Sequence, residues 1–108
     1  NKLQSDDLND NIMRLEPLAA KWRAFEWAVA EIDGHSLRGI LSGLRSASVT
    51  QGRPSVLICH TTKGKGVPYM EGKTQWHGSV KLTCEQAEEA LKALAASADE
   101  IKDLLDVR

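Results

Sequence analysis

The apolar residues that follow a polar start of the chain recur at the spacing of one helical face. This stripe consists of Leu18, Trp22, Phe25 and Val29. Pro17 precedes it and suits the first turn of a helix, where a missing backbone N–H does no harm. We therefore predict a helix over residues 17–26 and expect its stripe to pack in the core.

Two short apolar runs predict strands. The run from Trp27 to Ile32 alternates large and small groups and ends at the turn dipeptide Asp33-Gly34. The run from Ser55 to Cys59 is aliphatic and β-branched without polar alternation. Such a run is typical of a strand that is covered on both faces in a parallel sheet.

A second helix is predicted between the two strands, because Ser36 offers a helix cap and an apolar stripe follows it. The stripe consists of Leu37, Ile40, Leu41 and Leu44. The polar stretch from Ser46 to Pro54 contains glycine and proline, so we expect it to break this helix.

Helix start signals recur near the carboxyl end. Thr83 with Gln86 forms a capping box before an apolar face, and Ser97 with Glu100 forms a second one. The residues after these boxes that face inward would be Ala87, Ala90, Leu91 and Leu94, then Ile101, Leu104 and Leu105. One or two helices should close the chain, and residues 96–108 read as a charged helical tail with a solvated face.

The rest of the chain predicts loops. Residues 1–15 are polar, which indicates loop with short turns, and residues 60–80 carry four glycines without an apolar period. A loop of that length is usually functional or disordered. The order helix, strand, helix, strand, long loop, helix fits half of an open α/β sheet. Ligands in such sheets sit beyond the carboxyl ends of the strands, where this loop begins.

Composition narrows the classes of function. The 108 residues allow one domain, and a net charge of -1 gives no bias toward nucleic acid or an anionic membrane. Without an apolar run near the roughly 20 residues of a membrane span, or a signal-peptide pattern, the chain reads as soluble and cytoplasmic. Cys59 and Cys84 lack metal or redox spacing and read as ordinary buried or half-buried thiols. A first residue of Asn indicates a piece of a longer chain.

The segment from His60 to Gly66 (HTTKGKG) is the first candidate for chemistry, because it places Lys63 and Lys65 among glycines. Backbone amides and Lys63 could together hold a phosphate there. The spacing differs from a P-loop, since no Ser or Thr follows the second lysine. A solvated flexible turn is the alternative.

Three further groups are weaker candidates. In Trp76-His77-Gly78 an aromatic wall beside an imidazole could orient a polar ligand, although a lone loop histidine is more often solvated. For His35 and His60 we favour structural hydrogen bonds. The side-chain amide of Asn1 and the backbone carbonyls after it are hard oxygen ligands that suit magnesium, if carboxylates and phosphates come from elsewhere.

Five segments, taken in order, resemble the thiamine-diphosphate domain of transketolases, above all the amino-terminal subunits of two-part bacterial and archaeal enzymes. They are residues 1–4 (NKLQ), 17–25 (PLAAKWRAF), 33–35 (DGH), 60–66 (HTTKGKG) and 76–78 (WHG). The resemblance extends to about residue 95. It implies part of a three-layer α/β/α thiamine-diphosphate-binding fold with a mostly parallel sheet.

The resemblance also implies a reaction and its cofactors. The family transfers a two-carbon ketol unit from a ketose phosphate to an aldose phosphate with thiamine diphosphate and Mg²⁺ or Ca²⁺. By the same carry-over, the side chain of Asn1 and the carbonyl of Leu3 bind the metal. Lys63 lies near the cofactor, and His77 contacts cofactor and substrate as the catalytic residue. Gln4 and Ser5 approach the thiazolium side.

The chain also departs from the family pattern. Ser5-Asp6-Asp7 stands where Ile-Asp-Gly is common, and Glu26 replaces a frequent glycine. The upstream Gly-Asp-Gly motif with its metal-binding Asp is absent, as is the pyrimidine-side domain with its glutamate. We therefore expect a partial domain over residues 1–108 that is inactive alone and needs a pyrimidine-binding subunit or domain, in a homodimer or heterotetramer.

Two alternatives remain open at this stage. The parent protein could be another thiamine-diphosphate enzyme with a different donor or acceptor, since the residues that bind the acceptor largely lie outside this chain. It could also be a scaffold that kept the fold and lost the chemistry.

Overall fold

The computed structural model describes residues 1–78, 80–97, 99 and 101, which form two compact units. The first unit consists of residues 1–2 and 9–61, and the second of residues 3–8 and the described residues from 62 onward. Within the described part of the chain, no helix is both long enough and apolar enough to cross a bilayer.

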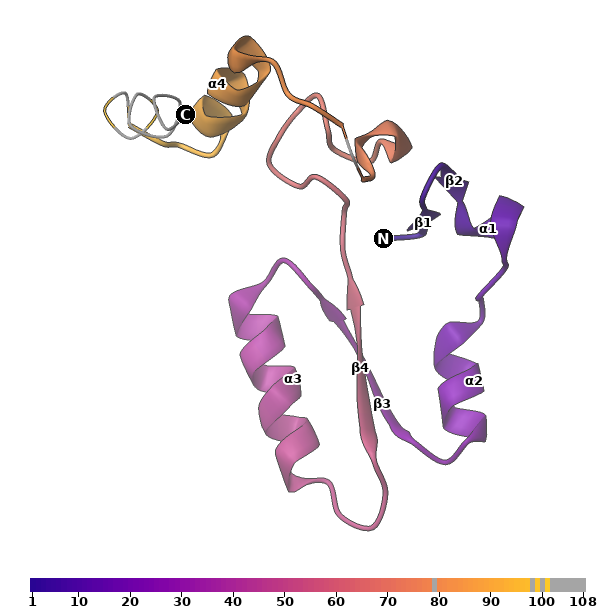
Figure 1. Ribbon diagram of the computed structural model, residues 1–108. Coiled ribbons are helices and arrows are strands. Elements are labelled where there is room, and N and C mark those ends of the chain that lie inside the picture. The colour runs from indigo at the N-terminus through magenta and orange to yellow at the C-terminus, as the bar shows by residue number, and fades with distance from the viewer. Residues whose placement is uncertain (79, 98, 100, 102–108) are drawn as a thin grey trace. The chain divides into compact units, whose positions relative to one another are not determined.

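The first unit is built around two parallel strands, β3 (Ala28–Asp33) and β4 (Ser55–His60) (Figure 1). They pair in register from Ala28 opposite Ser55 to Asp33 opposite His60. Helix α2 (Leu18–Ala24) precedes β3, and helix α3 (Leu37–Val49) connects the two strands. The short helix α1 (Asn9–Ile12) lies upstream. The sequence prediction of an α/β fold with a parallel sheet is therefore confirmed.

Helix α3 packs closely on the strands because its contact residue has no side chain. Gly43 is buried, and a Cβ at this position would lie 2.5 Å from Leu57 Cδ2 and 3.5 Å from Ile32 Cγ2. The helix begins as predicted, with Ser36 Oγ accepting a hydrogen bond from the Gly39 N–H at 3.1 Å. This cap satisfies one of the donors that every helix start leaves open.

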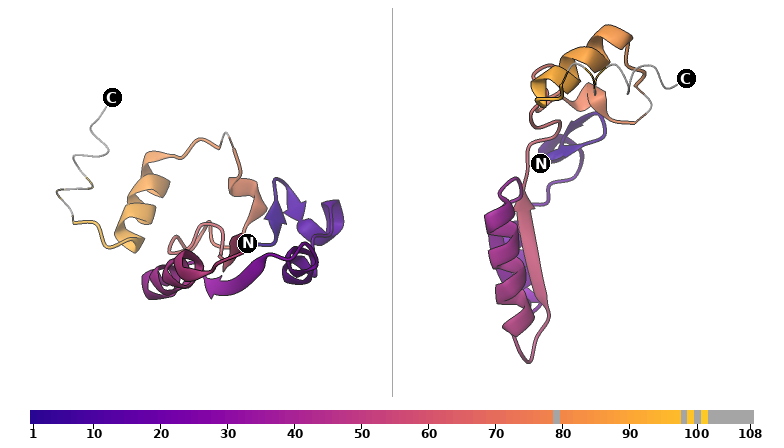
Figure 2. Two further views of the ribbon diagram at one scale, coloured as in Figure 1. Left: turned by 90° about the horizontal axis from the view of Figure 1, so that it is seen from below. Right: turned by 90° about the vertical axis from the view of Figure 1, so that its left-hand side faces the viewer.

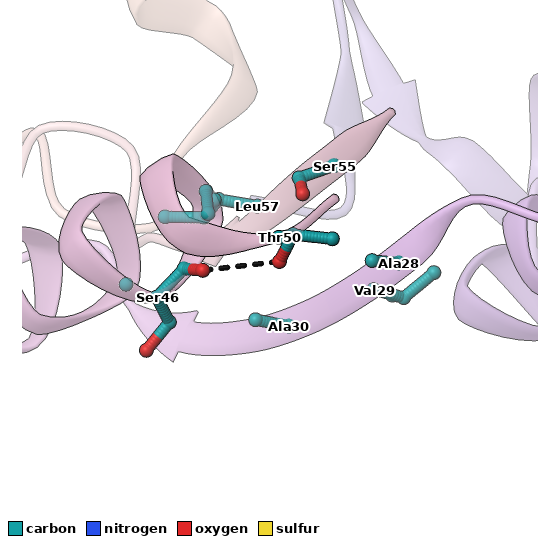
Figure 3. A pocket seen from close by; sticks show the side chains of 9 residues that line it. Ala28, Val29, Ala30, Ser46, Thr50, Ser55 and Leu57 are labelled. Carbon is teal, nitrogen blue, oxygen red and sulfur yellow. Dashed lines mark hydrogen bonds between the residues drawn. The ribbon is translucent and has the colours of Figure 1, made fainter. Parts of the chain in front are cut away.

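Helix α3 ends at Val49, inside the stretch from Ser46 to Pro54 that was predicted to break it, so its first polar residues still belong to the helix. Its polar side chains bond to carbonyls of the preceding turn. The Ser48 hydroxyl donates to the Arg45 carbonyl at 2.8 Å, and that of Thr50 to the Ser46 carbonyl at 3.0 Å (Figure 3). Residues that read as helix breakers are thereby accommodated in the last turn.

Several predictions of burial are also wrong. Phe25 is 76% exposed, although Leu18 and Trp22 of the same stripe are half-buried. The thiols of Cys59 and Cys84 are exposed, and the β4 residues from Ser55 to Ile58 are only half-buried. A parallel sheet of two strands offers too little surface to cover the helix stripes and to be covered on both faces itself.

The end of α2 explains one departure from the transketolase pattern. The helix ends at Ala24, Phe25 is its C-cap residue, and Glu26 follows with φ at +66°. This left-handed conformation is the usual one for a helix-terminating glycine, because a Cβ makes it unfavourable. The glycine that Glu26 replaces therefore belongs to a turn between α2 and β3.

The second unit contains a hairpin, a 3₁₀ helix and a longer helix. Strands β1 (Leu3–Gln4) and β2 (Asp7–Leu8) pair antiparallel, so the start of the chain is not only loop and turns as predicted. The 3₁₀ helix η1 (Thr74–Trp76) and helix α4 (Cys84–Ala93) follow (Figure 2). The second predicted capping box depends on Glu100, which lies outside the described residues, as does most of the predicted tail from residue 102 onward.

The predicted capping box of α4 is confirmed. Thr83 Oγ1 accepts from the Gln86 N–H at 3.2 Å, and Gln86 Oε1 accepts from the Thr83 N–H at 3.1 Å. We expect Thr83→Ala to lower the free energy of unfolding of the intact protein by about 1 kcal/mol, because the exchange removes one half of the box. Urea unfolding monitored by circular dichroism measures the change. Thr83→Ser is the control that keeps the hydroxyl, and an equal loss in it would contradict the capping role.

Candidate functional site

The segment of residues 62–78, which we call the Lys-Gly loop, is folded by hydrogen bonds of its own backbone. The Gly72 N–H donates to the Lys63 carbonyl at 2.8 Å and so closes the loop on itself. Shorter-range bonds include Met70 N–H to the Val67 carbonyl at 2.9 Å, and Val67 itself is buried. The solvated flexible turn considered from the sequence is therefore not what forms.

Gly64 allows this closure. Its φ is +68°, and a Cβ there would lie 2.8 Å from both the Cβ and the carbonyl oxygen of Met70. The loop segments around Gly64 and Met70 are thus in close contact. Only glycine can occupy position 64 there without strain. The main chain that carries Lys63 is fixed at this contact.

The loop brings two of the predicted site residues together. The ammonium nitrogen of Lys63 lies 3.5 Å from Nδ1 of His77, with Lys63 half-buried and His77 exposed. The ammonium can only donate, so Nδ1 accepts and the proton of the neutral imidazole sits on Nε2. The pair offers an anion one positive charge and one further N–H donor.

The second lysine of the motif has a different environment. Lys65 Nζ lies 3.1 Å from Glu71 Oε1, in an ion pair that is 54% and 36% exposed at the two side chains. Its charge is matched within the loop. Of the two ammonium groups that the sequence places among the glycines, that of Lys63 is the one next to an imidazole.

Two aromatic side chains of the Lys-Gly loop contact each other, and one of them, Trp76, directly precedes His77. Trp76 Nε1 donates to the Tyr69 carbonyl at 2.9 Å, and the Tyr69 hydroxyl donates to the Gln86 carbonyl of α4 at 2.6 Å. The two rings lie 5.2 Å apart at 60°. Burial, and to a lesser degree the charge of Glu89, raises the pKa of Tyr69, so its hydroxyl stays protonated as a donor.

The remaining predicted residues lie near the chain start. Leu3 and Gln4 form β1 opposite Leu8 and Asp7, and Ser5 begins the turn with φ at +45°. This hairpin belongs to the same unit as the Lys-Gly loop and lies beside η1 in both figures (Figures 1 and 2). Asn1 belongs to the first unit, so the shared role of Asn1 and Leu3 in metal binding stays a prediction.

The other two histidines have partners in the first unit. His60 ends β4, and its Nε2 lies 3.0 Å from Glu31 Oε2 on the neighbouring strand. Arg23 of α2 approaches the second oxygen of the same carboxylate at 3.6 Å. His35 follows Asp33, whose carboxylate accepts from the His35 backbone N–H at 2.9 Å. His60 therefore makes a structural contact between the two strands, as favoured from the sequence.

A hollow of about 160 Å³ between α3 and the strands is not part of this site (Figure 3). It is lined by Ala28, Val29, Ala30, Gly43, Ser46, Ala47, Thr50, Ser55 and Leu57. Ala28 and Ser55 begin their strands, so the hollow lies at the amino ends. Ligands of parallel sheets bind at the opposite, carboxyl ends.

The described residues contain no group of three or more His, Cys, Asp or Glu side chains that could hold a metal ion. The donors that the Lys-Gly loop does present, an ammonium and an imidazole, suit an anion such as a diphosphate. Residues 1–100 match the family described as transketolase, thiamine diphosphate binding domain. The chain belongs to this transketolase family. The family match and the parallel β3–β4 pair confirm the predicted thiamine-diphosphate-binding α/β fold.

Named relatives of the transketolase family cover most of this chain. It is 40% identical to one subunit of the apulose-4-phosphate transketolase of Phocaeicola vulgatus over 102 residues, 94% of this chain and 36% of that protein. It is 45% identical to the 6-deoxy-6-sulfo-D-fructose transketolase subunit SqwG of a Clostridium species over 94 residues, or 87% and 34%. The 1-deoxy-D-xylulose-5-phosphate synthase of Campylobacter jejuni is 41% identical over 83 residues, or 73% and 13%. The chain thus spans about a third of the first two relatives.

Sequence reasoning about this transketolase-family domain missed two features. Tyr69 was not singled out, because it stands in a stretch without apolar periodicity and outside the motifs HTTKGKG and WHG. The ion pair of Lys65 with Glu71 was also missed. A spacing of six residues between opposite charges is a signal only once the loop is known to close.

Proposed function

We propose that this chain is the carboxyl-terminal part of the diphosphate-binding region in the first subunit of a two-part transketolase. The whole enzyme transfers a two-carbon ketol unit between sugar phosphates. The observation that carries the proposal is the Lys63–His77 pair at 3.5 Å, in a closed loop that leaves the carboxyl end of β4. Two of the named relatives are transketolase subunits, which supports a partner subunit that supplies the pyrimidine side.

The residues of the chain divide the work. Lys63 would hold the diphosphate by charge, and His77 would donate from Nε2 to an oxygen of cofactor or substrate. The side-chain oxygen of Asn1 and the carbonyl of Leu3 would bind Mg²⁺, together with a carboxylate from outside this chain. Gln4 and Ser5 of the hairpin would lie on the thiazolium side of the cofactor. Thiamine diphosphate, when bound, supplies the carbanion stabilisation that no side chain can provide.

The test is ketol transfer by the intact protein with its partner subunit, thiamine diphosphate and Mg²⁺. We expect transfer between sugar phosphates that depends on the cofactor and on the metal. Calorimetric titration with thiamine diphosphate and Mg²⁺ runs beside it. Absence of both transfer and binding heat would refute the proposal and leave the scaffold alternative.

A second candidate is a related enzyme with another donor or acceptor, and the relatives favour it for a specific reason. They include proteins named for apulose 4-phosphate, for 6-deoxy-6-sulfo-D-fructose and for 1-deoxy-D-xylulose-5-phosphate synthesis. A donor screen over apulose 4-phosphate, 6-deoxy-6-sulfo-D-fructose and ordinary ketose phosphates separates the two candidates. Cofactor binding with turnover of only one unusual donor would replace the general assignment by that reaction.

A further inference from the structure

We propose that Tyr69 and Trp76 are positioning residues, which hold the Lys63–His77 pair in place by tying the Lys-Gly loop to helix α4. The proposal rests on the proposed function for the identity of the ligand. Its geometric basis is independent of the ligand. The question is how the long side chain of Lys63 and the exposed side chain of His77 keep one relative position.

The first link is Trp76, which directly precedes His77. Its ring is half-buried, and its Nε1–H donates to the Tyr69 carbonyl at 2.9 Å. The backbone N–H of His77 also donates to the Thr74 carbonyl of η1 at 3.1 Å. The main chain at His77 is therefore fixed by a short helix whose last side chain is anchored across the loop.

The second link is Tyr69, which connects this anchor to α4. Its hydroxyl donates to the Gln86 carbonyl at 2.6 Å, while its ring packs against that of Trp76 at 5.2 Å. Gln86 is itself fixed, because both its side chain and its backbone N–H belong to the capping box with Thr83. A carbonyl has two acceptor sites, so the tyrosine bond can coexist with the helix bond.

The third link returns to Lys63. Met70 follows Tyr69, and its backbone lies against Gly64, within 2.9 Å of where a Cβ would stand. The Lys63 carbonyl accepts from Gly72 in the same stretch. The segment of residues 69–72 thus contacts the main chain at Lys63 and Gly64, and its Tyr69 carbonyl accepts the hydrogen bond of the Trp76 indole. Such bracing keeps a site preorganised, so that less order must be imposed when the ligand binds.

The test removes one hydrogen bond at a time from the intact protein with its partner subunit. Tyr69→Phe deletes only the hydroxyl, and Trp76→Phe deletes the N–H donor while keeping a ring. Trp27→Phe is the matched control, because Trp27 packs against Trp22 at 4.8 Å in the other unit. Calorimetry gives the dissociation constant for thiamine diphosphate with Mg²⁺. The ¹⁵N shifts of the His77 imidazole report its tautomer without cofactor.

We expect each loop variant to raise the dissociation constant about fivefold, the effect of one net hydrogen bond, and to lower the share of the Nε2–H tautomer. Trp27→Phe should change neither. If both quantities stay at the wild-type values in Tyr69→Phe and Trp76→Phe, the positioning role is wrong. If the wild-type protein binds no thiamine diphosphate, the proposed function fails, and the tautomer measurement alone decides the positioning role.

Discussion

Lys63→Ala in the intact protein with its partner subunit should weaken the binding of thiamine diphosphate about 10- to 100-fold, with a matching loss of kcat/KM. A hydrogen bond between charged groups is worth roughly 1.5–3 kcal/mol, and an ammonium bound to a diphosphate makes such a bond. His77→Ala should also lower kcat, because the exchange removes a donor that acts on the reacting oxygens. Calorimetry and steady-state kinetics measure the two effects.

The matched control for this prediction is Lys65→Ala. It removes the same charge two residues further on, but its ammonium is already paired with Glu71 at 3.1 Å. We expect less than a threefold change in the dissociation constant, because an exposed ion pair contributes little. A larger effect at Lys65 than at Lys63 would contradict the assignment of the two lysines. Such a result would assign the anion site to Lys65 instead of Lys63.

Gly64→Ala should destabilise the intact protein by about 3 kcal/mol or more and abolish measurable cofactor binding. The new Cβ would meet the carbonyl oxygen and the Cβ of Met70 at 2.8 Å, and the backbone atoms there cannot move aside as a flexible side chain could. The φ of +68° adds conformational strain of the order of 1 kcal/mol. Thermal unfolding and calorimetry with thiamine diphosphate report the two losses.

Gly72→Ala separates steric overlap from strain. Gly72 has nearly the same φ, +70°, but nothing lies within 4 Å of its missing Cβ. We expect a loss of only about 1 kcal/mol and little change in binding. Equal behaviour of the two variants would show that the close approach at Met70 does not matter for the loop.

The local elements could be predicted from the sequence because their signals are local. The capping box of Thr83 and Gln86 involves residues three apart, and the aliphatic run from Ser55 has few alternatives to a strand. Helix α3 shows the limit of such signals. The stretch from Ser46 to Pro54 was predicted to break it, and the break does lie there, but the helix continues to Val49, where the hydroxyls of Ser48 and Thr50 bond to nearby carbonyls.

Burial could not be predicted in the same way. Periodicity tells which residues share a helix face, and Leu18, Trp22 and Phe25 do share one, but it does not tell how much surface there is to cover that face. Phe25 is 76% exposed, because a sheet with two strands has too little surface to cover it. Cys59, near the end of β4, is exposed for the same reason.

The candidate site was only partly visible in the sequence. The order of motifs pointed to Lys63 and His77, which lie 14 positions apart, and the folded loop places them at 3.5 Å. Nothing local marked Tyr69 as the residue that ties this loop to α4. A hydroxyl that reaches a carbonyl 17 residues away has no sequence signature.

The outer side of α3 has a consequence for how this chain stays folded. Leu37, Leu41 and Leu44 are 77%, 55% and 54% exposed, while the buried apolar residues in the described part of the chain are Val67 and Ile101, each 7% exposed. So small a dry interior contributes little toward the conformational entropy that folding removes. Any surface that covers this leucine row adds its binding free energy directly to the stability of the helix and strands beneath it. Association and folding of this segment are then one equilibrium, which shifts with the concentration of whatever covers it.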